Sequence, residues 1–357
     1  MSSITLEEME LEALGQCCDD QENDVEIEEI DQDDVDDSET MGLLDQYQDD
    51  MSAAESMAII MVNNLKSFEY MSFENEKENE DGVFKKAWDF IKRICQKIAD
   101  AITGFFRWVG NFFKNLFSGG KGKLEPASAE ELKEAEEKVV ESFMEKAGKV
   151  AAGAVAVVGT AAKVASTIDF KVMAPSRHNA LYDKIRDLSN KKANHITIVD
   201  RAASDYARNG KLSDDVIAGL QNANEDMRKH ISAMKDFVDA SAKTTLDEKT
   251  IRKFCEVAKT KDLRNYAKEI SKLGHTDTLS VRKLLEIKEI FTKKVHPNGE
   301  PVNKAAQIFS GCLSIASMAS SIMTKGVKTD MQFLSKAVQI QWSLSKAIKV
   351  IREVSGK

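Results

Sequence analysis

The chain has 357 residues, of which 42% are hydrophobic and 31% are charged, so it is long enough to bury a sizeable core. Its low proline content and its abundance of alanine, lysine and glutamate favour helices and exclude an all-β fold. The five cysteines match neither a disulfide framework nor a zinc-binding pattern, and acidic residues interrupt the N-terminal segment where a secretory signal would be apolar. We therefore expect free thiols and no export by that route.

Charge is distributed very unevenly along the chain. Residues 1–82 hold 27 acidic residues and two lysines, a net charge of −25, which leaves 48 basic and 32 acidic residues, a net charge of +16, for residues 83–357. Within Asp19–Glu39, 13 of 21 residues are acidic, and their mutual repulsion predicts a largely disordered arm. Two short helices are nevertheless predicted in this part: one could be lined by Ile4, Leu6, Met9, Leu11 and Leu14, and a second, at 52–66, begins with the capping box Ser52–Glu55. A polyanion of this kind could mask the basic body or dock on another basic protein.

The strongest local pattern lies between Phe84 and Phe117, where apolar residues recur every seven positions in two registers. This spacing predicts a long helix with one continuous apolar face and a net charge of +5. The apolar and aromatic residues that define the candidate membrane or partner face are Phe84, Trp88, Ile91, Ile98, Phe105, Trp108, Phe112 and Phe113. The basic residues that could bind phosphate or an anionic surface are Lys85, Lys86, Lys92, Arg93, Lys97, Arg107 and Lys114.

Two interpretations of this helix stay open. An apolar helical stripe most often packs into the core of its own protein. A face rich in aromatic residues beside lysine and arginine is also typical of helices that bind a membrane surface or a partner protein.

After a glycine-rich basic linker, the rest of the chain predicts an antiparallel array of helices, and the fold class is all-α. Three helix starts are marked by capping signals, which are the capping boxes Ser128–Glu131 and Thr245–Glu248 and a cap at Thr329. The expected helices span 129–168, 176–209, 213–243, 246–273, 279–295, 303–325 and 330–354. The expected domains are an acidic arm (1–82), the amphipathic helix (83–117), a flexible linker (118–128) and a basic helical body (129–357).

Two segments of the body are unusually rich in small residues. They are Val150–Ala162 and Ala305–Thr324, of which the second has twenty residues without a charge. Small residues permit close packing of helices in water and in lipid. We expect a buried central hairpin, with insertion into a membrane, permanent or conditional, as the alternative.

No sequence motif predicts catalysis or metal binding. Metalloprotease, hydrolase and zinc signatures are absent, and the glycine-rich linker lacks the Lys-Ser/Thr pair of a phosphate-binding loop. The histidines are scattered singly, so we expect them at the surface or at helix ends and not as ligands; they are His178, His195, His230, His275 and His296. We expect no enzyme activity, no catalytic residue, no metal, no cofactor and no small-molecule substrate.

The organisation of the first third of the chain resembles that of internal head proteins of large tailed bacteriophages, including inner-body proteins of giant phages. The segments that carry the resemblance are the opening residues 1–12, the acidic arm, and the stretch Ala87–Ile94 that runs into Phe112–Phe117. In such families a prohead protease cuts after Glu in small-x-Glu sequences and releases an acidic propeptide. The resemblance therefore implies cleavage after Glu69 or Glu74, each of which ends a Ser-Phe-Glu sequence, with Glu55 as a weaker site.

The resemblance implies a non-enzymatic virion protein that is packaged in the capsid interior with the DNA, is made in the host cytoplasm and is often ejected with the genome. Its expected partners are packaged DNA without sequence preference, other capsid or inner-body proteins and the prohead protease. No helix-turn-helix or zinc finger argues for base-specific recognition. Two alternatives are a membrane-active effector or ejection-channel protein that uses residues 84–117 on a membrane surface, and an inhibitor of host defence delivered with the genome.

The first prediction concerns proteolytic processing near the boundary between the acidic residues 1–82 and the basic residues 83–357. Cleavage after Glu74 removes 23 acidic residues and Lys66 and changes the net charge from −9 to +13, which suits association with DNA. Mass spectrometry of the protein from mature particles should find a new N-terminus at Tyr70 or Asn75. An intact N-terminus at Met1 or Ser2 in all of the packaged protein would contradict this prediction.

Overall fold

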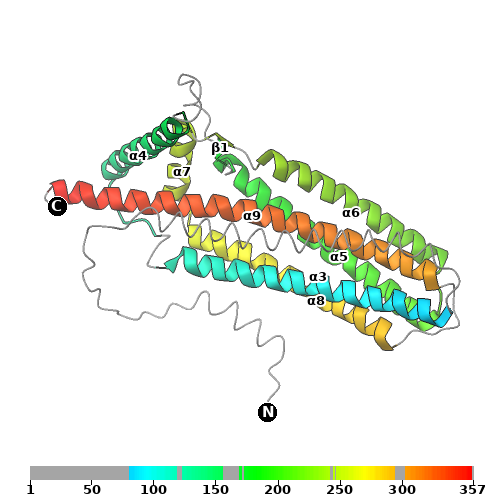
Figure 1. Cartoon of the computed structure of the whole chain (residues 1–357). Helices are drawn as coiled ribbons and strands as arrows, with labels where there is room; N and C mark the ends of the chain where they lie inside the picture. The colour runs from blue at the N-terminus through cyan, green and yellow to red at the C-terminus, as the bar shows by residue number, and fades with distance from the viewer. Residues whose placement is uncertain are drawn as a thin grey trace, which may run out of the picture. The chain divides into compact units, whose positions relative to one another are not determined.

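The structure is a computed structural model that describes the backbone of residues 80–118, 123–155, 169–170, 173–241, 244–245, 247–293 and 302–355. The all-α prediction is confirmed for these residues (Figure 1). The helices are α3 (Glu80–Leu116), α4 (Ala129–Val155), η3 (Pro175–Arg177), α5 (His178–Asn209), α6 (Asp214–Ser241), α7 (Glu248–Thr260), α8 (Leu263–Lys293) and α9 (Val302–Ser355). The described strands are a two-residue antiparallel pair, β1 (Asp169–Phe170) and β2 (Thr244–Thr245). The acidic arm, the predicted helix at 52–66 and the three candidate cleavage sites lie outside the described residues.

The described residues form two compact units that do not follow the domain boundaries expected from the sequence. The first unit contains residues 80–110, 193–225 and 277–321, and the second contains 111–192, 226–276 and 322–355. Helices α3, α5, α6, α8 and α9 each contribute to both units. The amphipathic helix is therefore not a separate module, because its residues belong to the same cores as those of the body.

The core of the first unit is organised around aromatic rings from several helices. Trp88 of α3 stacks on Phe291 of α8, with ring centroids 4.4 Å apart and an angle of 12° between the ring planes. Tyr206 of α5 lies against Trp88, and Phe309 of α9 meets Tyr206 edge-on. Burial of large aromatic side chains contributes several kcal/mol to stability, so α3 is part of the core of this unit.

The second unit includes helix α4 and the segment before it. The capping box at Ser128 is confirmed, because Ser128 Oγ accepts from the Glu131 amide at 3.2 Å and Glu131 Oε2 accepts from the Ser128 amide at 2.7 Å. Arg352 near the end of α9 donates to Glu131 and to the Pro126 carbonyl. These bonds to Arg352 and the Ser128 amide hold the pKa of Glu131 at about 2. Glu125 and Pro126, which the sequence assigned to a flexible linker, are thus held against α9.

The start of α7 differs by two residues from the predicted capping box. The cap is Asp247, whose Oδ1 accepts from the Thr250 amide at 2.7 Å, whereas Thr245 lies in strand β2. The predicted helix 246–273 is interrupted, because α7 ends at Thr260 and Asp262 caps α8 by accepting from the Asn265 amide at 2.9 Å. An aspartate has the same capping geometry at both starts.

Two helix ends predicted from the sequence are wrong, because α8 and α9 run without interruption through them. Helix α8 passes through Gly274, and glycine in a helix costs only about 1 kcal/mol. Thr329, predicted as a cap, lies inside α9 and donates its hydroxyl to the Lys325 carbonyl at 3.0 Å. Gly326 serves close packing, because a Cβ there would lie 2.6 Å from Met234 Cε and 3.1 Å from Ile185 Cγ1.

Helix α9 contains the segment Ala305–Thr324 and is the helix in the described part of the chain that is long and apolar enough to cross a membrane. Half of its most apolar window is buried inside the protein. Val150–Val155 belong to α4, and the remainder of the first small-residue segment lies outside the described residues. The hairpin of these two segments therefore stays a prediction.

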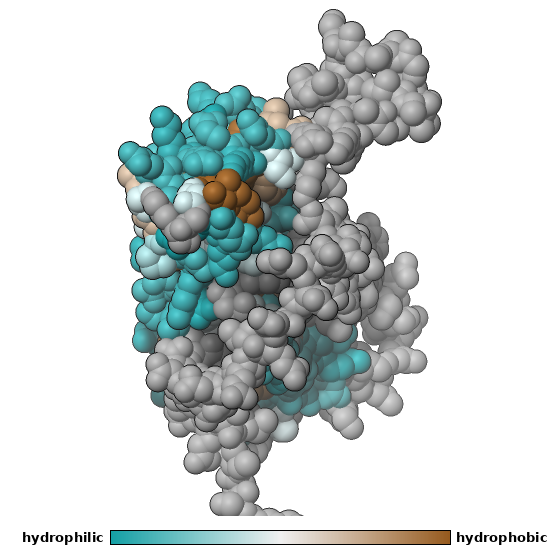
Figure 2. Space-filling model, turned by 90° about the vertical axis from the view of Figure 1, so that its left-hand side faces the viewer, coloured by the Kyte–Doolittle hydropathy of each residue, from teal (hydrophilic) through white to brown (hydrophobic). Residues whose placement is uncertain are grey.

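The described cysteines are buried. Cys95 and Cys312 lie in the first unit and Cys255 lies in the second. Burial raises the pKa of Cys95 and that of Cys255 to about 12. Most of the described surface in Figure 2 is hydrophilic, with a small hydrophobic cluster; exposed apolar residues include Val350 and Val354 near the end of α9.

Candidate functional site

The apolar face of α3, predicted as a membrane or partner surface, lies in the protein's own core. The buried members are Trp88, Ile91, Ile98, Phe105, Phe112 and Phe113. Trp108 is half-buried, and the side chain of Phe84 lies outside the described residues. In the first unit Trp88, Ile91 and Ile98 pack against apolar residues of α5, α8 and α9. An apolar helical stripe is most stable where other apolar surfaces exclude water from it. A membrane could contact this face only if α3 left the core.

The opposite face of α3 is basic and faces solvent. Arg93, Lys97, Arg107 and Lys114 are exposed. Lys92 is half-buried and forms an ion pair with Asp89. The structure describes the backbone but not the side chains of Lys85 and Lys86. The sequence therefore identified both faces of α3, and burial of the aromatic face leaves the basic face as the surface that a ligand can reach.

Few acidic groups neutralise the basic face. Asp100 is exposed, and its Oδ1 accepts a hydrogen bond from Gln96 at 2.7 Å. Lys97, Arg107 and Lys114 form no ion pair with any residue that the structure describes. Four cations along one helix attract anions without regard to their detailed shape.

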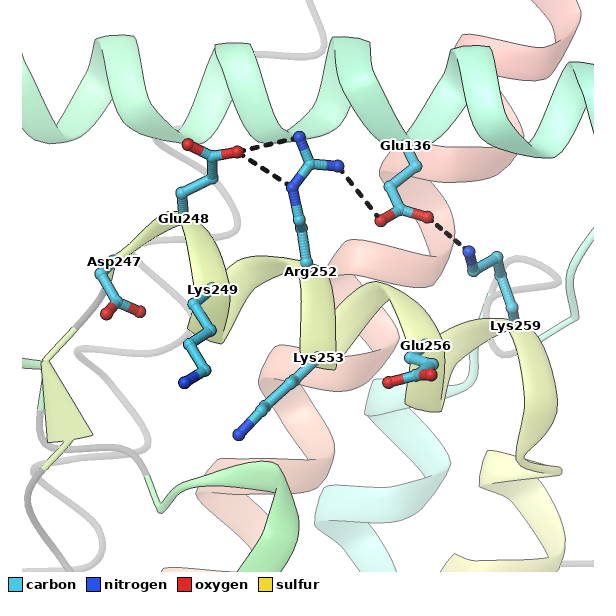
Figure 3. A pocket seen from close by; sticks show the side chains of 8 residues that line it. All are labelled: Glu136, Asp247, Glu248, Lys249, Arg252, Lys253, Glu256 and Lys259. Atoms are coloured by element: carbon cyan, nitrogen blue, oxygen red, sulfur yellow. Dashed lines mark hydrogen bonds and ion pairs between the residues drawn. The ribbon is translucent and has the colours of Figure 1, made fainter.

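A charged hollow of about 630 Å³ lies between α4 and α7 in the second unit (Figure 3). It is lined by Glu136, Asp247, Glu248, Lys249, Arg252, Lys253, Glu256 and Lys259. Arg252 Nη2 lies 2.8 Å from Glu137 and 2.9 Å from Glu248, and Lys259 Nζ lies 2.5 Å from Glu136. Because Arg252 and Lys259 of α7 both pair with glutamates of α4, we interpret the hollow as the ionic seam that holds α4 against α7.

The second unit also contains a buried polar cluster that sequence reasoning missed. Asp330 of α9 is fully buried, and the Tyr266 hydroxyl of α8 lies 2.7 Å from its Oδ1 and 2.6 Å from its Oδ2. Lys261, the residue after α7, places Nζ 3.7 Å from the centroid of the Tyr266 ring and 3.1 Å from Asn179 Oδ1. Lys261 Nζ also lies 2.5 Å from His178 Nε2 at the start of α5.

Burial shifts the protonation of every member of this cluster toward the neutral form. It raises the pKa of Asp330 to about 7, although the Tyr266 hydroxyl and Lys261 oppose the shift. It lowers the pKa of Lys261 to about 8 and that of His178 below its ordinary value. An acid and an amine with these values could exchange a proton near neutral pH, but in the described structure a dissolved substrate does not reach the Asp330 carboxyl group.

The expectation that the histidines lie at the surface or at helix ends is wrong for His195, and His178 is buried although it begins α5. His178 stacks on Phe333 with ring centroids 4.7 Å apart. The His195 ring places Nε2 2.8 Å from Asn224 Oδ1, and His230 is half-buried between Asp187 and Asp226. Within the described residues, no group of three or more histidine, cysteine or acidic side chains is placed to hold a metal ion.

Comparisons of the chain with protein-family models, with curated proteins and with solved structures give no match. The features of this chain that bear on its function are the exposed basic face of α3, the two charged clusters of the second unit and the opposite charges of the arm and the body.

The second prediction tests whether Trp88 is a permanent part of the core. Trp88→Ala removes the ring stacked on Phe291 and should destabilise the protein by about 3–5 kcal/mol. Trp108→Ala, in the same helix but half-buried, should cost clearly less. Urea unfolding monitored by circular dichroism measures both. A change below about 1 kcal/mol for Trp88→Ala, together with lost binding to anionic vesicles, would instead assign the face to a membrane.

The third prediction concerns the pH dependence that Asp330 gives to stability. Because the pKa of Asp330 is about 7 in the folded protein and about 4 in an unfolded chain, the folded state binds the extra proton between these values. Stability from this group is therefore lost as the pH rises from about 4 to about 7, by up to ~1.4 kcal/mol per pH unit. Asp330→Asn keeps an oxygen that accepts from Tyr266 and removes this dependence.

Urea midpoints of the wild type and of Asp330→Asn, measured between pH 4.5 and pH 7, should diverge in favour of the variant as the pH rises. The matched control is Asp239→Asn, because the pKa of Asp239 is lowered by its hydrogen bond from Lys325. Because Asp239 is ionised in both the folded and the unfolded state above about pH 5, Asp239→Asn should shift the midpoint by a nearly constant amount across this range. Parallel curves for the wild type and Asp330→Asn would show that Asp330 is not held in its protonated form.

Proposed function

We propose that this protein is a non-enzymatic virion protein of a large tailed bacteriophage, packaged inside the capsid and associated there with DNA. The proposal assigns the body a binding role, with packaged DNA and other capsid or inner-body proteins as partners. Synthesis takes place in the host cytoplasm, and ejection with the genome is part of the proposal.

The observation that carries the proposal is the basic face of α3 in a region, residues 83–357, with a net charge of +16. Arg93, Lys97, Arg107 and Lys114 are exposed along one helix while the aromatic face of that helix is buried. Their spacing gives a row of cations about 32 Å long, from the rise of 1.5 Å per residue. Such a row binds phosphates by releasing their condensed counterions and carries no information about base sequence.

Proteolysis fits this role because it changes the net charge of the protein from negative to positive. Before cleavage the acidic arm makes the chain net negative, with a charge of −9, which disfavours contact with nucleic acid during synthesis. A prohead protease that cuts after Glu69 or Glu74 would leave a positive protein in a compartment filled with DNA. The charge change thus couples DNA association to assembly of the head.

Helix α9 favours a second candidate function, a membrane-active effector that works during ejection. Its length and apolar composition are sufficient for a helix that crosses a membrane. In the described structure half of its most apolar window is buried in the core, so this function requires the body to open first.

The fourth prediction tests DNA association through α3. It uses the full-length chain with the acidic residues of Asp19–Glu39 changed to their amides, so that the arm does not compete for cations. The triple change Lys97→Gln, Arg107→Gln and Lys114→Gln should reduce the slope of log K against log salt by about 2–3, because each lost phosphate contact lowers it by about 0.9. Fluorescence anisotropy with two 30-base-pair duplexes of unrelated sequence measures both slope and specificity.

The matched control changes three exposed lysines on other elements, Lys211, Lys249 and Lys253, to glutamine. This control should alter the slope by less than the α3 variant and leave the two duplexes equally bound. No binding by the chain with the amidated arm at low salt would refute the proposed function. A strong preference for one duplex would refute binding through phosphates alone.

A further inference from the structure

The exposed face of α3 has the charge and the dimensions to bind a flexible acidic peptide as well as DNA. With 3.6 residues per turn, Arg93, Lys97, Arg107 and Lys114 fall on one side of the helix. Asp100 is the acidic residue among them, and it bonds to Gln96 of the same helix. This face therefore offers a row of cations with little compensation from described neighbours.

The same chain contains a polyanion of matching size, the segment Asp19–Glu39 with 13 acidic residues among 21. Its length when extended is up to about 70 Å, so a part of it is sufficient to pair with all four cations. The 40 residues between Glu39 and Glu80 form a tether that can span up to about 130 Å. Lys114 lies only about 50 Å along α3 from Glu80, so the tether reaches the whole basic face.

From this complementarity we infer that the segment Asp19–Glu39 binds the exposed basic face of α3 within the same molecule and keeps other polyanions from it. The occupant is a segment of this chain because its charge is opposite, its tether is long enough, and the tether ends at the first residue of the helix that carries the face. A second copy of the chain and nucleic acid are the competing occupants.

The energetics favour the tethered segment while it is attached. An exposed ion pair contributes only about 0.2–1 kcal/mol, so a free acidic peptide would bind weakly. A tether of this kind raises the effective concentration of the segment to about the millimolar range, which makes several weak pairs sufficient. The pairs are screened at high salt, where the Debye length falls to about 3 Å at 1 M.

Cleavage after Glu69 or Glu74 would convert the attached segment into a separate peptide and remove the advantage of effective concentration. DNA phosphates at high density could then replace it. This consequence for DNA rests on the proposed function, whereas binding of the segment to α3 does not.

The experiment is zero-length carbodiimide cross-linking of the full chain at low salt, which joins a carboxylate to an amine only where the two are in contact. Peptide mass spectrometry should find carboxylates of Asp19–Glu39 joined to Lys97 and Lys114 at least several-fold more often than to Lys211 and Lys235, which are exposed on other elements. The excess should disappear in 1 M NaCl.

A pair of arginine variants separates binding at α3 from general attraction. Arg93→Gln with Arg107→Gln leaves both reporter lysines in place and should reduce their cross-links several-fold. The control, Arg201→Gln with Arg228→Gln, removes two exposed arginines elsewhere and should leave the cross-links unchanged. Equal yields at all exposed lysines, or equal losses in the two double variants, would overturn the inference.

A mixture of ¹⁴N- and ¹⁵N-labelled chains identifies the molecule that supplies the segment. Cross-links within one label support the inference, and cross-links mainly between labels would overturn it in favour of a second copy. DNA binding by the chain with the amidated arm is measured separately, so that the proposed function and the binding of Asp19–Glu39 to α3 can fail independently. Cross-links at α3 without such binding would refute the proposed function alone, and binding without an excess of cross-links would refute only the inference.

Discussion

The constraint on which the rest of the structure depends is the burial of the aromatic face of α3. Trp88 lies against Phe291 and Tyr206 in the core of the first unit, with 6% of its surface exposed. This packing fixes the rotation of the helix about its axis, because the apolar stripe and the basic stripe are on opposite sides. The hydrophobic effect thus decides which charges face solvent, and the proposed interactions with DNA and with the acidic arm both follow from that choice.

The parts of the fold that the sequence predicted correctly depend on local signals. The seven-residue spacing from Phe84 and the capping box at Ser128 each act within one or two turns of helix, and both appear as expected. The errors at Gly274 and Thr329 arose where a local stop signal was weaker than the packing of a long helix. The cluster of His178, Lys261, Tyr266 and Asp330 could not be predicted, because its members come from separate helices and meet only after tertiary packing. Its one local signal, an aspartate on the apolar side of α9, was hidden by the helix boundary placed before Asp330.

The polar cluster and the ionic seam of the second unit differ in how their charged groups are stabilised. At the seam between α4 and α7, Arg252 and Lys259 keep contact with water while they pair with glutamates, so each pair costs little desolvation and contributes little energy. Around Asp330 the surroundings exclude water, and the carboxyl group is accommodated because burial shifts it toward its neutral form. The first arrangement is sensitive to salt and the second to protons, so one unit contains two contacts that respond to different changes in the solution.

The three buried thiols in the described part of the chain give each unit a chemical reporter of its own. Thiolate is the species that reacts with alkylating reagents and oxidants, and a pKa of about 12 leaves very little thiolate at neutral pH for Cys95 and Cys255. Reaction at these positions therefore requires a local or global opening that returns the sulfur to water. Since Cys95 and Cys312 belong to the first unit and Cys255 to the second, the rates at which the separate thiols become labelled report how often each unit opens. The frequency of local opening in each unit can thus be measured from the labelling of the chain's own cysteines, and no additional cysteine has to be introduced.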